Sequence, residues 1–271
     1  LAARPLSFFA EEGCRVTELF EQALGEFNAH MGTAYTSEAI ELVPITRRNG
    51  VRKKNAVIER LHARNKSVSS PSAFSYLFGE AIIGMDGDRA SGKAAILFRT
   101  DLQGWASEES ILMHELSHVF AITREYGGRW FPDDVEEDDF AALSGYGIWK
   151  EFIANYIASQ CADPPPVHLN PLPVREKKML LKKDMDSHDD LSRYLCWAVC
   201  TEESKSANLD RILEEKHIPF PRLIKLLAEK VREENYWEIK IDLMEELGNQ
   251  FIVDKAMLAV DLSYEDLLAG K

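Results

Sequence analysis

The chain of 271 residues is 45% hydrophobic and 28% charged, with 15 glycines and 11 prolines, which is ordinary globular composition. This composition excludes collagen-like, low-complexity and disordered proteins, and no apolar run reaches the roughly 18–20 residues that a membrane-spanning helix needs. The formal net charge of −13 disfavours binding to nucleic-acid phosphates, so neither a nucleic-acid partner nor a membrane is expected.

The first elements predicted in chain order are a helix and a pair of strands. Apolar residues recur at helical spacing from about Ser7 to Met31, which predicts an amphipathic helix. From about Ala39 to Leu61 the pattern favours strands, with Asn49-Gly50 as the two-residue turn of a hairpin. The tip of this predicted hairpin is strongly basic and carries Arg47, Arg48, Arg52, Lys53 and Lys54.

Further strands and a helix follow in the middle of the chain. The segment from Phe74 to Thr100 is typical of strands punctuated by glycine, and it ends in the β-prone run Ala94–Thr100. A helix is predicted from Ser107, whose hydroxyl can accept a hydrogen bond from the first turn. We expect this helix to stop at Gly127-Gly128, because glycine readily adopts the left-handed conformation of a helix cap.

The last part of the chain is predicted to be helical. A helix is expected from about Gly147 to Gln160, and several prolines then interrupt regular structure before a helical region from about Val174. The predicted fold is therefore α+β, with a small mixed or antiparallel sheet, followed by a helical C-terminal region. The predicted domains are residues 1–162 and 176–271, joined by a proline-rich connection at 163–175.

The four cysteines predict a reduced protein. Cys14, Cys161, Cys196 and Cys200 form no CxxC pair, and their spacing is not that of a disulfide framework. We interpret them as buried thiols. The amino terminus lacks a charged start followed by an apolar core of the signal-peptide type, so a cytoplasmic location is expected.

One short segment carries the residues of a metal site. His114-Glu115-Leu116-Ser117-His118 lies in a predicted helix, where residues four apart occupy the same face one turn along. Two imidazoles at this spacing can bind one zinc ion at about 2.0–2.1 Å. Glu115 is rotated by about 100° from His114 and can flank the metal without binding it. The helix also has an apolar back, formed by Leu112, Leu116, Val119 and Phe120.

A catalytic zinc usually has three protein ligands and one open position, so a third ligand is expected from another element. The downstream candidates are the acidic loop 133–139, Glu151, His168 and His188. We select Glu151, because a carboxylate among the apolar residues of a predicted helix is costly unless it is paired or binds metal. The simpler alternative is that Glu151 is an exposed helix residue beside Lys150. We interpret the acidic loop as a solvated connection.

Other polar residues are candidates for supporting roles. Asn155 lies four residues after Glu151 on the same face, and it is predicted to hydrogen-bond the second ring nitrogen of a ligand histidine. An additional donor should stabilise the oxyanion of the transition state. The candidate donors are Tyr146, Tyr156 and Arg124, and the sequence does not choose among them.

Two motifs resemble those of the gluzincin metallopeptidases, and of the ImmA/IrrE family in particular. The first is His114-Glu115-Leu116-Ser117-His118, and the second is Glu151-Phe152-Ile153-Ala154-Asn155-Tyr156-Ile157-Ala158. The resemblance covers about residues 75–162. It implies a zincin-like fold in which His114, His118 and Glu151 bind zinc and Glu115 is the general base. It also implies an edge strand ahead of the active helix, and Ala94–Thr100 is the segment in position to be that strand.

The expected function is zinc-dependent hydrolysis of a peptide bond in a protein or peptide substrate. Glu115 would take a proton from the activated water and later deliver it to the leaving amine. The alternative is a zinc-containing regulatory or interaction protein that has a zincin-like fold but no catalysis. A third interpretation, a metal-free helical scaffold, predicts that the purified protein contains no zinc. The substrate and the oligomeric state are not predicted.

Overall fold

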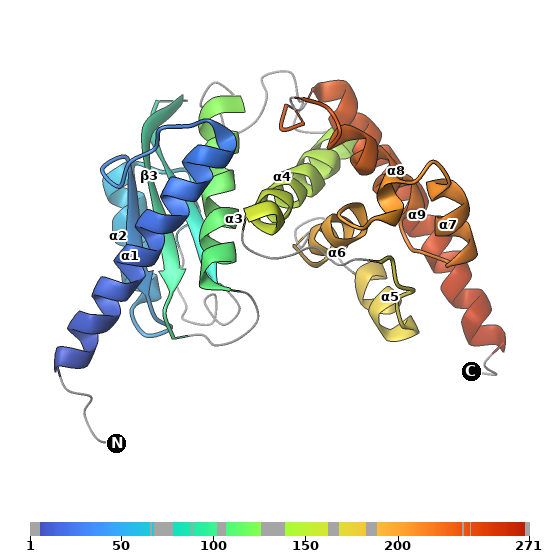
Figure 1. Cartoon of the computed structure of the whole chain (residues 1–271), viewed down its shortest axis with the longest axis horizontal. Coiled ribbons are helices and arrows are strands. Elements are labelled where there is room, and N and C mark those ends of the chain that lie inside the picture. Colours follow the sequence, from blue (N-terminus) through green and yellow to red (C-terminus); the bar gives the residue numbers. More distant parts are fainter. Residues whose placement is uncertain are drawn as a thin grey trace. The chain divides into compact units, whose positions relative to one another are not determined.

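The computed structural model describes residues 6–65, 67, 78–87, 89–101, 107–125, 139–161, 168–182, 189–234, 236–238 and 240–268. It describes their side chains except at residues 6–14, 124, 125, 189 and 265–268. These ranges contain nine α-helices and one small sheet of three strands (Figure 1), so the predicted α+β class is confirmed. None of the described helices combines the length and the apolar character that a bilayer crossing requires.

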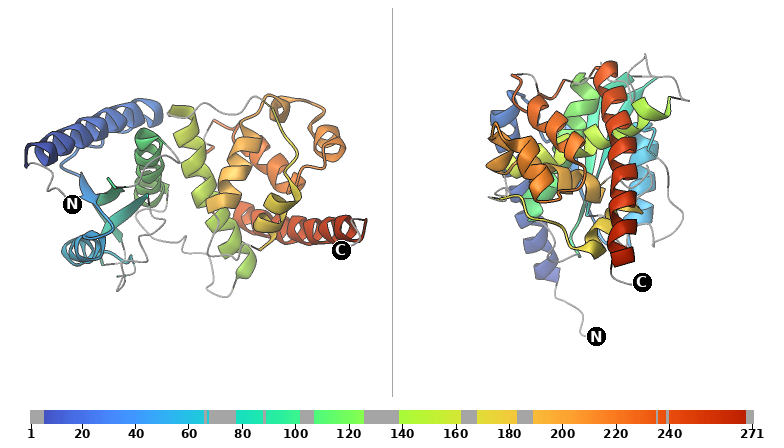
Figure 2. Two further views of the ribbon diagram at one scale, coloured as in Figure 1. Left: turned by 90° about the horizontal axis from the view of Figure 1, so that it is seen from below. Right: turned by 90° about the vertical axis from the view of Figure 1, so that its right-hand side faces the viewer.

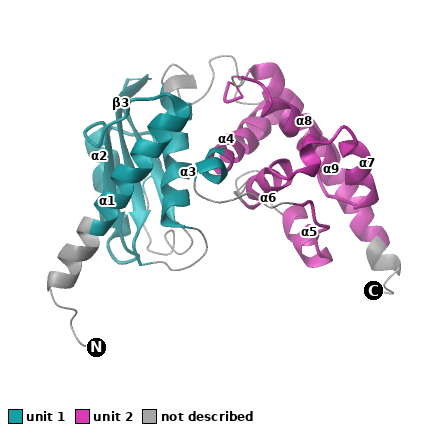
Figure 3. Cartoon of the chain, in the orientation of Figure 1, with its two compact units in different colours: residues 1–130, 157–163 teal, residues 131–156, 164–271 magenta. Residues whose placement is uncertain are grey.

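The chain divides into two compact units, which Figure 3 shows in different colours. The first unit contains residues 1–130 and 157–163, and the second contains residues 131–156 and 164–271. Helix α4 (Phe140–Cys161) begins in the second unit and ends in the first. These units differ from the predicted ranges 1–162 and 176–271, because residues 131–156 group with the C-terminal helices.

The first unit is built around a mixed sheet in the order β1-β3-β2. Strand β1 pairs in parallel with β3, and β2 pairs antiparallel with β3 across the turn at Gly87, whose φ is +62°. The small sheet predicted as mixed or antiparallel is therefore confirmed, and it is mixed. The elements are α1 (Leu6–Met31), β1 (Ile40–Ile45), α2 (Gly50–Leu61), β2 (Gly79–Asp86), β3 (Arg89–Arg99) and α3 (Glu108–Phe120).

Helices cover both faces of this sheet. The left view of Figure 2 shows α1 and α3 on one face and α2 on the other. Ala95 and Leu97 of β3 pack with Val57 of α2 in a buried cluster. Because side chains alternate along a strand, the neighbouring Ile96 and Phe98 face the α1 and α3 side, and both are fully buried.

The predicted hairpin at Asn49-Gly50 is wrong. Only β1 is a strand, and helix α2 begins directly at Gly50. The Asn49 side chain accepts a hydrogen bond from the Thr46 amide (2.8 Å), and this local turn leads into the helix. The residues after Gly50 bury Lys54 and Val57 at helical spacing, so the 3.6-residue period outweighs the Asn-Gly turn signal.

The predicted edge strand is also wrong. Ala94–Arg99 belongs to β3, which has hydrogen-bonded neighbours on both sides and cannot add a peptide. All six of these residues are buried, and a continuous apolar run of this kind is typical of a central strand. The strand at the edge of the sheet beside α3 is β2.

Helix α3 begins as the sequence predicts. The Ser107 hydroxyl accepts a hydrogen bond from the Ser110 amide (3.0 Å), which caps the first turn. The α-helix ends at Phe120 and continues as a π-helical turn, Ala121–Glu125. The predicted stop at Gly127-Gly128 lies outside the described residues.

The second unit is helical, as predicted for the C-terminal region. After α4 come α5 (Val174–Leu181), α6 (Asp189–Val199), α7 (Leu209–Glu215), α8 (Pro221–Lys230) and α9 (Ile241–Leu268). Helix α4 starts at Phe140, seven residues before the predicted start at Gly147. The glycines in it suggest a break, but Gly145 permits close packing instead, because a Cβ there would lie 1.8 Å from the Met244 carbonyl oxygen of α9.

Candidate metal centre

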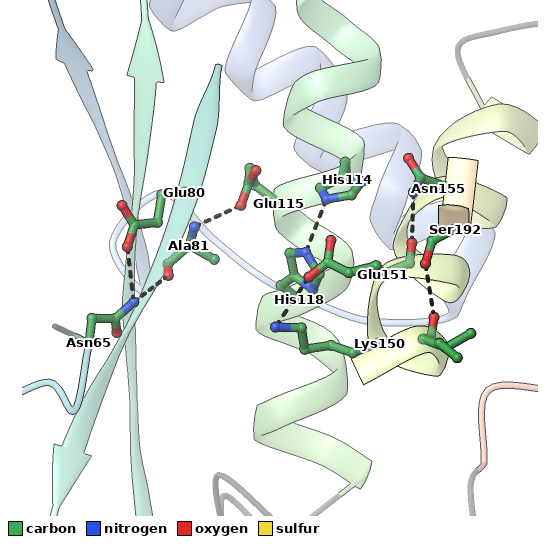
Figure 4. A network of polar contacts seen from close by, with 11 residues as sticks. Asn65, Glu80, Ala81, His114, Glu115, His118, Lys150, Glu151, Asn155 and Ser192 are labelled. Carbon is green, nitrogen blue, oxygen red and sulfur yellow. Dashed lines mark hydrogen bonds and ion pairs between the residues drawn. The ribbon is translucent and has the colours of Figure 1, made fainter. Parts of the chain in front are cut away.

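Helix α3 places two imidazoles on one face. The Nε2 atoms of His114 and His118 are 3.0 Å apart, and the ring centroids are 4.6 Å apart (Figure 4). The opposite face of the helix is the predicted apolar back, and its four residues are at most 2% exposed. The two-faced helix predicted from the sequence is therefore confirmed. Burial of the back fixes the direction in which the polar face points.

The structure brings the three predicted ligands together. One ligand atom each from His114, His118 and Glu151 lies within 4.8 Å of the others, so this group could hold a metal ion. Two imidazole nitrogens and one carboxylate oxygen are a donor set that suits zinc, which prefers nitrogen, sulfur and carboxylate ligands. Three protein ligands would leave a fourth tetrahedral position open, as at a catalytic zinc.

Glu115 lies beside the two histidines and is held by the sheet. It is only 6% exposed, and its Oε2 accepts a hydrogen bond from the Ala81 amide at the edge strand β2 (2.7 Å; Figure 4). The carboxylate also lies against Gly79, where a Cβ would come within 2.8 Å of Glu115 Cγ and 2.9 Å of Oε1. The contacts with Gly79 and Ala81 fix the direction of the carboxylate, which points toward β2 (Figure 4).

A polar network supports the edge strand at the same point. Asn65 Nδ2 donates to the Ala81 carbonyl oxygen (3.1 Å), while the Ala81 amide donates to Glu115. The next residue back, Glu80, accepts two short hydrogen bonds from the buried ammonium of Lys54 (2.6 and 2.7 Å). Sequence reasoning missed all of these contacts, because they join positions 16 to 34 residues apart and no local pattern marks them.

Glu151 has local partners on α4. The Lys150 ammonium lies 3.2 Å from its Oε1, and the Glu151 side chain is 14% exposed. The alternative interpretation, that Glu151 is an exposed residue, is therefore wrong, although Lys150 does contact it. Asn155 Nδ2 donates to the main-chain oxygen of Glu151 (2.9 Å), while its predicted bond to a histidine ring stays a prediction.

The three candidate donors differ in what surrounds them. Tyr146 is buried, and both burial and the negative charge of Glu151 raise the pKa of its hydroxyl. Tyr156 packs edge-on against Tyr236 at 5.5 Å, and burial raises its pKa to about 12. The Arg124 side chain lies outside the described residues. Of the two tyrosines, Tyr146 is the one whose hydroxyl senses the Glu151 charge, and both hydroxyls remain protonated at neutral pH.

Of the other candidate ligands that the structure describes, His168 is not part of this group. His168 is exposed, and its Nδ1 lies 3.3 Å from Glu203 Oε1, in the second unit. His188 and residues 133–138 of the acidic loop lie outside the described residues. Asp139, the last residue of that loop, accepts a hydrogen bond from the Ala142 amide (2.9 Å) at the start of α4.

Comparison with known proteins assigns neither a family nor a function to the chain. No protein-family model matches the sequence, and no curated protein or solved structure matches it significantly. The chemistry of the site therefore has to be argued from its own residues.

Proposed function

We propose that the protein is a zinc-dependent peptidase that hydrolyses a peptide bond. The observation that carries this proposal is the convergence of His114, His118 and Glu151, with the buried side chain of Glu115 on the same helix as the two histidines. A three-ligand donor set with a separate carboxylate has the composition of a catalytic zinc site. A purely structural zinc site usually has four protein ligands instead.

The roles of the residues follow from their chemistry. A zinc ion held by the three ligands would activate a water molecule at neutral pH and polarise the scissile carbonyl group. Glu115 accepts the proton of the attacking water and returns it to the leaving amine. Since the Ala81 amide holds Oε2 of Glu115, the carboxylate keeps its orientation during these transfers. Tyr146 is the candidate that we favour as donor to the oxyanion, because it is within the electrostatic reach of Glu151.

We propose that the substrate is an extended segment of a protein or peptide. Strand β2 forms one edge of the sheet, and an extended peptide can add to such an edge through main-chain hydrogen bonds. Both outward main-chain groups of Ala81 are already hydrogen-bonded, the amide to Glu115 and the carbonyl oxygen to Asn65, so a peptide that adds to β2 would use other main-chain groups of this strand.

The resemblance to gluzincins of the ImmA/IrrE family is consistent with this proposal. The two motifs lie on α3 and α4, and both are helical as the resemblance implies. A zincin-like fold remains part of the proposal, and it rests on these motifs and on the mixed sheet beside α3.

The variant Glu115→Gln tests the proposal most simply. The neutral amide cannot act as a base, so we expect hydrolysis to fall by about 10²–10⁴-fold while one zinc per chain is retained. The measurement combines cleavage of a fluorescent peptide library with zinc analysis by emission spectroscopy. Glu109→Gln is the matched control, because it changes an acidic residue in the first turn of the same helix and should leave cleavage unchanged.

The same experiment distinguishes the peptidase from the alternative, a zinc-containing regulatory protein without catalysis. If zinc-loaded wild-type protein cleaves no member of the library, or if Glu115→Gln cleaves as fast as the wild type, the peptidase proposal is wrong.

A further inference from the structure

Helix α9 carries an exposed apolar face that the other helices of the second unit do not cover. One side of α9 buries Leu258 and Leu262, and this helix contacts α5 and α8. The other side carries four exposed apolar residues, which we call the α9 stripe: Val253, Met257, Val260 and Tyr264. The most exposed of them are Val260 (69%) and Tyr264 (64%). Single exposed apolar residues are common, but a contiguous row of them marks an interaction surface.

The α9 stripe has the spacing of a coiled-coil seam. Successive members are four, three and four residues apart, which is the heptad spacing at which one helix packs lengthwise along another. Ala256 lies on the same surface between Val253 and Val260, and its small side chain allows a second helix to approach closely. In Figure 1 the C-terminal turns of α9 extend past α7 and α8 of the same unit. The α9 stripe therefore fits a second helix.

The surface is large enough for an interface between two copies of the chain. The α9 stripe and the adjoining Ile252 expose on the order of 500 Å² of apolar surface, at the upper end of what a typical monomer shows. Two such faces would together bury about 1,000 Å², the lower limit for a specific interface. Met257 also lines a cavity of about 440 Å³, together with Leu213 and Asp254, so the apolar surface continues beyond the stripe. An interface of this size predicts a weak dimer, with a Kd in the micromolar range.

The spacing of the α9 stripe is self-complementary. The order of four, three and four residues is the same in both directions, so a two-fold axis between Met257 and Val260 maps the stripe onto itself with the two helices antiparallel. Val253 then lies opposite Tyr264 of the second copy, and Met257 lies opposite Val260 of the second copy. Each outer layer combines a small side chain with a large one, as a well-packed seam requires. This match favours a second copy of α9 as the occupant.

The charges of α9 favour the antiparallel orientation. Glu246 is exposed and lies seven residues before Val253, which is the preceding equivalent position of the heptad. In a parallel pair in register, the two Glu246 carboxylates would face each other and repel. In the antiparallel pair each Glu246 lies beyond the end of the partner's stripe. No member of the α9 stripe is charged, so the paired surfaces themselves contain no repulsion.

We propose that the α9 stripe joins two copies of this chain into a two-fold symmetric dimer with antiparallel α9 helices. Removal of the four apolar side chains of each copy from water drives the association. The surface belongs to the second unit and shares no residue with the candidate metal centre. The proposal is therefore independent of the proposed zinc chemistry.

Analytical ultracentrifugation of the full chain tests whether the dimer forms. Between about 1 and 200 µM protein, we expect the mean mass to rise from that of one chain toward that of two. A mass of one chain at every concentration would overturn the proposal. Growth beyond two chains would also overturn it, because a closed two-fold interface stops at the dimer.

The variant Val260→Lys tests the position of the interface. Val260 is 69% exposed, so each chain should keep the circular dichroism spectrum of the wild type. A charge buried in the seam should weaken the dimer by about tenfold or more. Met179→Lys is the matched control, because Met179 is a half-exposed apolar residue of α5 outside the α9 stripe and should leave the Kd unchanged. Wild-type affinity in Val260→Lys, or an equal loss in Met179→Lys, contradicts the assignment.

Cross-linking tests the orientation and does not depend on the charged variant. The variants Val253→Cys and Tyr264→Cys are treated with a short bismaleimide, separately and as a mixture, and the wild type controls for the four native cysteines. In the antiparallel dimer the two copies of position 253 are about 16 Å apart along the helix axis, so only the mixture should give more product than the wild type. A product from either variant alone, or none from the mixture, contradicts the antiparallel pair.

Discussion

Glu115 and Asp254 are both buried carboxylates that accept main-chain N–H bonds, yet their surroundings differ in kind. Glu115 accepts a bond from the edge strand β2 and is adjacent in sequence to His114. Asp254 receives two bonds from the first turn of α8 and lies against a largely apolar cavity wall. The burial is similar, but the neighbours differ, so we propose proton transfer for Glu115, whereas Asp254 caps the first turn of α8.

The largest expected effect concerns the neighbours of Glu115. Replacing His118 by Ala removes one of the two imidazoles of the candidate centre, so the zinc content should fall from one per chain to nearly none. Dialysis followed by emission spectroscopy measures this. His168→Ala is the control, because that exposed histidine lies beside Glu203 and should leave the zinc content unchanged. A full complement of zinc in His118→Ala would show that the metal binds elsewhere.

An intermediate effect is expected where β2 holds the Glu115 carboxylate. A Cβ at Gly79 would come within 2.9 Å of both Glu115 Oε1 and Ile111 Cγ2, so Gly79→Ala should displace the general base by several tenths of an ångström. We expect kcat to fall by about 10–100-fold with zinc retained, because small misplacements of catalytic groups are costly.

The control for this substitution is Gly25→Ala in α1. No atom lies within 4 Å of a Cβ at that position, so alanine should be neutral or stabilising in this helix. If Gly79→Ala were as active as Gly25→Ala, the contact between β2 and Glu115 would have no catalytic role.

The smallest effect concerns Asp254 and is a dependence of stability on pH. Burial raises the pKa of Asp254 from the ordinary aspartate value of 3.8 to about 6, so this group stabilises the fold fully below about pH 4, and the contribution is lost as the pH rises through 6. Asp254→Asn lacks this titration. Relative to the wild type, the variant should therefore be more stable at pH 7 than at pH 5.

Urea unfolding at the two pH values measures this difference, and each unit of pKa shift corresponds to about 1.4 kcal/mol. Asp210→Asn should show no comparable change, because Asp210 is exposed. A difference between Asp254→Asn and wild type that is the same at pH 5 and pH 7 would mean that Asp254 does not titrate as its burial implies.

The residues of α3 could be predicted from the sequence because their pattern is local. The Ser107 cap, the apolar back and the spacing of His114 and His118 all lie within one helix, so a single periodicity describes them. The same reasoning selected Glu151, as an isolated carboxylate in an apolar helix. Asp254 follows Phe251, Ile252 and Val253 and carries the same signal, so this argument could have found it as well.

The remaining features of the fold and of the site depend on contacts between distant residues, which no local pattern encodes. The bond from Ala81 to Glu115 joins residues 34 positions apart, and its existence depends on β2 rather than β3 lying at the edge of the sheet. The Asn49-Gly50 pair predicted a hairpin because its turn chemistry fits both a hairpin turn and a turn before a helix. Only the burial of Val57 against the sheet favours the helix. Similarly, the glycine at 145 suggests a break, whereas it permits close packing of α4 and α9.

Anomalous diffraction at the zinc absorption edge, from crystals of the zinc-loaded full chain, tests the central claim most directly. The account predicts one strong peak per chain, within bonding distance of imidazole nitrogens of His114 and His118 and of a carboxylate oxygen of Glu151, with Glu115 outside bonding distance. A peak on other residues, or no peak between these three side chains, would contradict it.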